Sequence, residues 1–102
     1  MSARRLAIAA CFVVPCSVFA SDLGREVFTE IAQPPCALCH TLEAAGATGT
    51  VGPSLDELRP ERQRVITTVR DGIGVMPSFE GTLTAEQIEA VADFVAGATG
   101  GR

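Results

Sequence analysis

Two cysteines and a histidine stand close together in the first half of the chain, in the order Cys36-Ala37-Leu38-Cys39-His40. Two thiols at this spacing can form thioethers with the two vinyl groups of one haem, and the imidazole that follows can ligate its iron. A four-ligand zinc site and a redox-active dithiol are the alternatives. The spacing favours one haem c, covalently attached through Cys36 and Cys39, with His40 as an iron ligand.

Met76 is the candidate for the opposite face of the iron. We expect it at the tip of an apolar loop, residues 72–77, where Pro77 stiffens the backbone that presents it. The alternative is a methionine that fills the hydrophobic core. Ligation by His40 and Met76 would occupy both axial positions and raise the reduction potential, which suits electron transfer rather than substrate chemistry at iron.

The dipeptide Gly52-Pro53 offers a partner for the second ring nitrogen of His40. A ligating histidine commonly donates that N–H to a carbonyl group, which fixes the tautomer and the ring orientation. The Pro53 carbonyl is the predicted acceptor, and an ordinary Gly-Pro turn is the alternative.

The first twenty residues have the organisation of a signal peptide. Arg4 and Arg5 precede an uncharged apolar run, residues 6–19, and Ala20 closes a segment suited to signal peptidase. The run is shorter than the roughly 20 residues of a membrane-spanning helix. We predict a signal peptide, residues 1–20, and an exported domain, residues 21–102, in the periplasm; a membrane anchor and lipidation at Cys11 are the alternatives.

The net charge and the length of the domain exclude some classes of function. The chain has 8 basic and 12 acidic residues and no lysine; loss of Arg4 and Arg5 would leave 6 − 12 = −6 in residues 21–102. This charge argues against binding to nucleic acids and to anionic membrane surfaces. Domains this short usually need a disulfide, metal or cofactor for stability, and a haem would serve that purpose.

Apolar periodicity predicts an all-α domain. A first helix carries an apolar stripe and ends at Gln33-Pro34-Pro35. Gly24 within it indicates close contact with another helix, and a first-turn glycine of little energetic cost is the alternative. Residues 41–52 are predicted to be a loop. The stripe of the first helix is Leu23, Val27, Phe28 and Ile31.

Capping signals place three more helices. A short helix follows the Ser54/Glu57 capping box and ends before Pro60, which would open the next helix, and Gly72 ends that one. The last helix follows the Thr84/Gln87 capping box and would end at Gly97, with residues 100–102 frayed. The predicted apolar positions of the last two helices are Val65, Ile66, Val69, Ile88, Val91, Ala92 and Val95.

These motifs together resemble the small bacterial class I cytochromes c. The resemblance implies a cytochrome c fold of about four short helices around one haem, with thioethers at Cys36 and Cys39 and axial ligands His40 and Met76. It also implies that the first and last helices cross, with Gly24 and Phe28 meeting Phe94. The matching segments are Gly24-x-x-x-Phe28, residues 36–40, Gly52-Pro53-Ser54-Leu55, residues 74–79 and Asp93-Phe94.

Three features depart from the family pattern. Phe28 lies eight residues before Cys36, about twice the common gap, so the segment Gln33-Pro34-Pro35 must absorb the excess. No Trp or Tyr is available to bond the haem propionates, so Arg59, Arg62 or Arg70, or backbone N–H groups, must do so. Without a lysine ring, the docking face of a partner should be basic or largely apolar.

The resemblance implies a function as a periplasmic one-electron carrier rather than an enzyme, cycling haem iron between Fe(III) and Fe(II). Its redox partner proteins would be a dehydrogenase donor and a respiratory acceptor. The segment from Gln33 to Pro53 is similar to cytochromes that partner periplasmic sulfite dehydrogenases. A haem enzyme or gas-binding haem protein with a labile sixth ligand, and a thiol–disulfide protein, are the alternatives.

Overall fold

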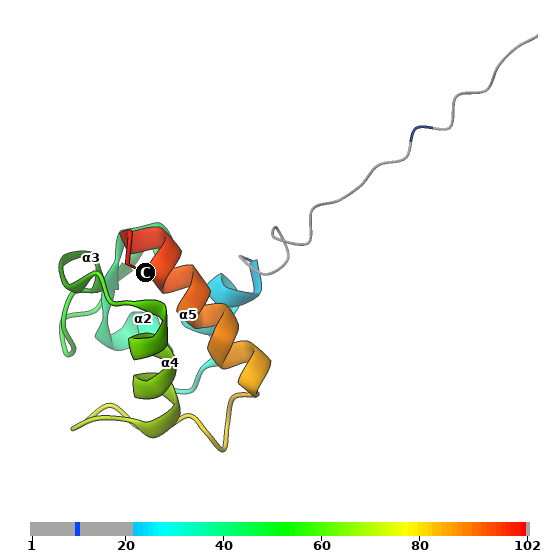
Figure 1. Cartoon of the computed structure of the whole chain (residues 1–102). Helices are drawn as coiled ribbons and strands as arrows, with labels where there is room; N and C mark the ends of the chain where they lie inside the picture. Colours follow the sequence, from blue (N-terminus) through cyan, green and yellow to red (C-terminus); the bar gives the residue numbers. More distant parts are fainter. Residues whose placement is uncertain (1–9, 11–21, 102) are drawn as a thin grey trace, which may run out of the picture.

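The computed structural model describes residue 10 and residues 22–101 (Figure 1). Helices dominate, and residues 22–26 form an α-helical segment that continues into the first of them. The helices are the π-helix η1 (Val27–Ile31), α2 (Cys36–Cys39), the 3-10 helix η2 (Glu43–Ala45), α3 (Leu55–Leu58), α4 (Arg62–Asp71) and α5 (Ala85–Thr99). Within the described residues no helix has both the length and the apolar character to cross a membrane. The predicted signal peptide lies outside the described part of the chain, apart from residue 10.

The first helical segment and α5 pack against each other, side by side in Figure 1. A Cβ atom on Gly24 would lie 2.6 Å from the Cβ of Phe94 and would also overlap the carbonyl oxygen of Ala90. One turn further on, the rings of Phe28 and Phe94 meet edge to face, with their centroids 6.1 Å apart. The predicted crossing of the first and last helices at these residues is therefore confirmed.

The π-helix η1 changes the apolar stripe of the first helix. Val27 and Phe28 are buried as predicted, but Ile31 is 36% exposed, so its assignment to the buried stripe was wrong. A π turn holds more residues than an α turn, and this rotates Ile31 out of the expected position. The wider turn also accommodates part of the long gap before Cys36, and α2 starts as a separate helix after residues 33–35.

Residues 41–52 contain more structure than the predicted loop. The strand β1 (Thr41–Leu42) pairs antiparallel with β2 (Ala47–Thr48), with Leu42 opposite Ala47. Leu42 is fully buried and Ala47 nearly so. Strands of two residues are too short to show alternation in the sequence, so the prediction missed this small sheet.

Capping fixes the start of the later helices. The Ser54 hydroxyl accepts a hydrogen bond from the Glu57 backbone N–H (3.4 Å) at the start of α3, and the predicted Thr84/Gln87 capping box opens α5 with both of its hydrogen bonds. Pro60 does not begin α4, contrary to prediction. Glu61 is the N-cap, and the helix follows at Arg62.

The C-terminal end of α5 also differs from prediction. The helix runs through Gly97 to Thr99 and ends at Gly100, which has the left-handed conformation (φ 74°). Arg59 Nε donates to the Thr99 carbonyl (2.8 Å), and Gly101 packs against Pro60, so residues 100 and 101 are held in place rather than frayed. Arg102 lies outside the described residues.

The hydrophobic core joins the first helical segment to α4 and α5. The apolar stripes of the last two helices are buried as predicted, although Ile66 is only partly so. Figure 1 shows α4 and α5 lying next to each other with the α2 segment behind them. The core residues of these two helices are Val65, Val69, Ile88, Val91, Ala92 and Val95.

Candidate functional site

A cavity of about 630 Å³ lies next to the core, within the roughly 300–1,000 Å³ typical of small-molecule and cofactor sites. Its walls are mostly apolar side chains from α3, α4, α5 and the loop that follows α4. The structure brings all five predicted site residues to this cavity: Cys36, Cys39, His40, Pro53 and Met76.

The short helix α2 presents both thiols to the cavity. Pro35 is its N-cap in an extended conformation, and the helix closes with a hydrogen bond from the His40 backbone N–H to the Cys36 carbonyl (3.0 Å). Burial raises the pKa of the Cys36 thiol to about 11, so this sulfur is uncharged at neutral pH. A thioether has no ionisable proton, and conversion of Cys36 to a thioether is compatible with this apolar position.

The ring of His40 has one defined nitrogen partner. His40 Nδ1 lies 2.8 Å from the Pro53 carbonyl oxygen, which is the hydrogen bond that the sequence predicted. A carbonyl can only accept, so Nδ1 carries the proton and donates it. In the neutral imidazole the lone pair is then on Nε2, the tautomer that a metal-ligating histidine needs.

Two glycines let the loop before Pro53 approach the Cys-x-x-Cys-His segment closely. A Cβ on Gly52 would lie 2.6 Å from His40 Cε1, and one on Gly49 would lie 2.6 Å from the Leu38 carbonyl oxygen. The Gly52 N–H donates to the Cys39 carbonyl (2.7 Å), which ties the loop to the motif. In the sequence, the signal for this close approach is the pair of glycines three residues apart, Gly49 and Gly52, and the prediction rested on Gly52-Pro53 alone.

Substitution of Gly52 by alanine tests this contact. The added methyl overlaps the imidazole, so we expect a displaced His40, a changed haem absorption spectrum and a lower yield of haem-loaded protein. Gly81→Ala is the matched control, because a Cβ there meets no atom within 4 Å. If Gly52→Ala has the spectrum and yield of the wild type, the glycine is not required for placing the ring.

Met76 sits on a tight turn. Ile73 and Met76 exchange two backbone hydrogen bonds (3.1 and 2.9 Å) around Gly74 and Val75, and Gly74 has the positive φ (57°) that the turn requires. Gly74 and Val75 therefore form the tip, and Met76 lies after it rather than at the tip as predicted. Met76 is half-buried and packs against the core.

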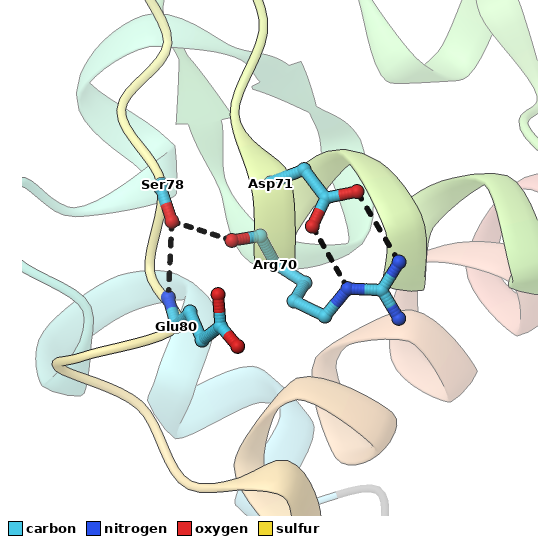
Figure 2. Close-up of polar contacts among 4 residues, drawn as sticks. All are labelled: Arg70, Asp71, Ser78 and Glu80. Carbon is cyan, nitrogen blue, oxygen red and sulfur yellow. Dashed lines mark hydrogen bonds and ion pairs between the residues drawn. The ribbon is translucent and has the colours of Figure 1, made fainter.

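The segment that follows Met76 is fastened to the end of α4 (Figure 2). The Ser78 hydroxyl donates to the Arg70 carbonyl (2.5 Å) and accepts from the Glu80 N–H (3.4 Å). The Phe79 N–H donates to the Val69 carbonyl (2.9 Å). In the same figure the Arg70 guanidinium pairs with Asp71 (2.9 Å), which lowers the pKa of that exposed carboxyl group. The hydrogen bonds of Ser78 and Phe79 to α4 hold the backbone that follows Met76, whose side chain lines the cavity.

The contacts of three arginines differ from the prediction that one of them bonds the haem propionates. Arg59 bonds the Thr99 carbonyl, Arg62 pairs with Asp93 (2.5 Å) and Arg70 pairs with Asp71. None of these three lines the cavity, so they do not support the predicted role. Arg64, which the sequence analysis did not single out, does line it.

The chemistry of the cavity fits a covalently attached haem. Its mostly apolar walls suit the porphyrin ring, and two thiols line it. It is also lined by the hydrogen-bonded imidazole of His40 and by the thioether of Met76, which are both types of iron ligand. No three His, Cys, Asp or Glu side chains gather into a candidate metal site in the described part of the chain.

Comparison with known proteins finds a family, a related protein and a solved structure that are similar to this chain. The family model described as "Cytochrome C oxidase, cbb3-type, subunit III" matches residues 21–95. A cytochrome c6 from Microcystis aeruginosa is 52% identical over 33 residues, which are 32% of this chain and 41% of that protein. The crystal structure of the c-type cytochrome SorU from Sinorhizobium meliloti is similar with a TM-score of 0.77 and 54% identity, over 82% of this chain and 95% of that one.

Proposed function

We propose that this chain, which belongs to the cytochrome c family, carries single electrons in the periplasm between a dehydrogenase and a respiratory acceptor. The family is shown by the match to the cbb3-type subunit III family and by the similarity to SorU. The chain is a small mono-haem class I cytochrome c, with one haem c bound covalently through Cys36 and Cys39. The observation that carries the proposal is the convergence of His40 and Met76 on one apolar cavity with both thiols.

In this proposal each site residue has a separate role. His40 offers Nε2 to the iron while its Nδ1–H stays bonded to Pro53. Met76 would offer its sulfur to the iron from the loop that follows α4, which would leave no iron position open to a substrate. When bound, the haem supplies the Fe(III)/Fe(II) couple, and thioether ligation raises its potential. The apolar walls exclude water, so little rearrangement is needed when the electron moves.

The mouth of the cavity suits brief contact with a partner protein. Val51, Ile73 and Val75 line the cavity and are 70%, 69% and 89% exposed. Such apolar side chains form a docking surface that does not depend on lysine, in agreement with the expectation of a basic or largely apolar face on the partner. A sulfite dehydrogenase stays the candidate donor because of the resemblance in the segment from Gln33 to Pro53.

The absence of lysine from the sequence predicts an unusual alkaline form. If high pH displaces Met76 from the iron, no lysine amine can take its place, and we expect a hydroxide-ligated or high-spin ferric haem. The check is a ferric absorption and electron paramagnetic resonance titration of protein with a blocked N-terminal amine. A low-spin amine adduct under these conditions would contradict the prediction.

Rapid-mixing assays with purified dehydrogenases test the proposed carrier role. We expect a periplasmic dehydrogenase, with sulfite dehydrogenase as the first candidate, to reduce the ferric protein in the presence of its substrate, and a respiratory oxidase to reoxidise it. Low-spin protein that no such donor reduces would refute the proposed donor class. Ferrous protein that binds carbon monoxide readily would instead indicate a gas-binding or catalytic haem.

A further inference from the structure

One charged side chain lines the cavity without a role in the site described above. Arg64 is the only Arg, Lys, Asp or Glu among the described residues that line it. Its guanidinium has no hydrogen-bond or ion-pair partner within the described part of the chain, whereas Arg59, Arg62 and Arg70 are all engaged elsewhere. Among the described lining residues there is therefore one cation without a partner and no acidic side chain to neutralise it.

The position of Arg64 is set by α4. It lies in the first turns of that helix and is exposed, while its neighbour Val65 is buried in the core. Thr68, one turn further along, also lines the cavity, so the two residues lie on the same face of the helix. Arg64 is thus the charged, water-facing member of a mostly apolar wall.

A haem brings two propionate carboxylates into this cavity. An ionised carboxylate taken out of water without a partner is costly, and an arginine is well suited to bind it through two parallel N–H donors. We propose that Arg64 is the propionate-binding residue of this cytochrome. The proposal rests on covalent haem attachment at Cys36 and Cys39 and is independent of the identity of the sixth ligand.

The expected effect of Arg64 on the reduction potential follows from the charges of the propionate and the guanidinium. An unpaired carboxylate near the ring favours Fe(III) over Fe(II), and the guanidinium offsets that negative charge. Arg64 should therefore raise the reduction potential, and its removal should lower it. Because the side chain is exposed, water screens part of this effect.

Nuclear magnetic resonance of the unmodified ferrous holoprotein tests the contact directly. We expect nuclear Overhauser effects between the Arg64 Hε proton and the methylene protons of one propionate. Such effects from another arginine, or from none while Arg64 shows rapid exchange with water, would overturn the proposal. The low-spin absorption spectrum of the same sample reports axial ligation, so a failure of the proposed His/Met site is recognised separately.

Variants supply the second test. Arg64→Gln should lower the midpoint potential at neutral pH, and Arg64→Lys should restore most of the difference, while both keep the low-spin spectrum. Arg62→Gln is the matched control, since it removes the same charge from the same helix turn but outside the cavity. Equal shifts for Arg62→Gln and Arg64→Gln would reduce the effect to long-range charge and overturn the proposal.

Discussion

Replacement of Met76 by alanine is expected to open one axial position of the iron. The ferric iron–thioether absorption band should disappear, the ferrous protein should bind carbon monoxide, and the reduction potential should fall. Axial ligands set haem potentials over about 0.8 V, so we expect a decrease on the order of a tenth of that range or more. Optical titration in an electrochemical cell, with and without carbon monoxide, measures all three.

The neighbour Val75 provides the control for Met76. Its side chain is 89% exposed at the tip of the same turn and carries no group that ligates iron. Val75→Ala should keep the thioether band and a potential close to that of the wild type. If Met76→Ala keeps them as well, Met76 is a core residue, and the sixth ligand must be found elsewhere.

Substitution of Gly24 by alanine is expected to lower the free energy of unfolding strongly. The new methyl would overlap the backbone of α5 at Ala90 and the Cβ of Phe94, and neither can rotate away. Overpacking of this kind costs about 1–3 kcal/mol of unfolding free energy. For a domain of this size each kilocalorie lowers the melting temperature by roughly 4–8 °C. Thermal unfolding of the ferric holoprotein, followed by circular dichroism, measures the change.

Gly97→Ala is the matched control, because its outcome should have the opposite sign. Gly97 lies inside α5 with no atom within 4 Å of its added Cβ, so the higher helix propensity of alanine should stabilise the protein by up to about 1 kcal/mol. A Gly24→Ala protein as stable as the wild type would show that the two helices can separate without cost, contrary to the packing described above.

Local signals in the sequence predicted much of this structure. The capping residues Ser54 and Thr84 placed the starts of α3 and α5, and the resemblance to the class I cytochromes c implied the crossing at Gly24. Features that depend on tertiary contacts were not predictable in this way. The π-helix that exposes Ile31 is one such case, and the continuation of α5 through Gly97 is another: a lone glycine ends a helix only when the chain adopts a left-handed turn there, which happens at Gly100.

The candidate site likewise contains residues that the sequence predicted and one that it did not. Cys36, Cys39 and His40 were identified from spacing alone, since covalent chemistry demands adjacency along the chain. The arginine that we propose for the propionates was not predicted, because the sequence suggested Arg59, Arg62 or Arg70 and nothing in the spacing set Arg64 apart. Only the direction of the side chains separates them: Arg62 turns to Asp93 on α5, Arg59 turns to the end of α5, and Arg64 alone lines the cavity.

We propose that His40 and Met76 ligate the iron from its two faces. The most direct test of this ligation is the near-infrared magnetic circular dichroism and absorption of the wild-type ferric holoprotein at neutral pH, followed by reduction under carbon monoxide. We expect the signature of His/Met ligation and no carbon monoxide adduct. A high-spin ferric spectrum, or prompt formation of the adduct, would contradict the proposal.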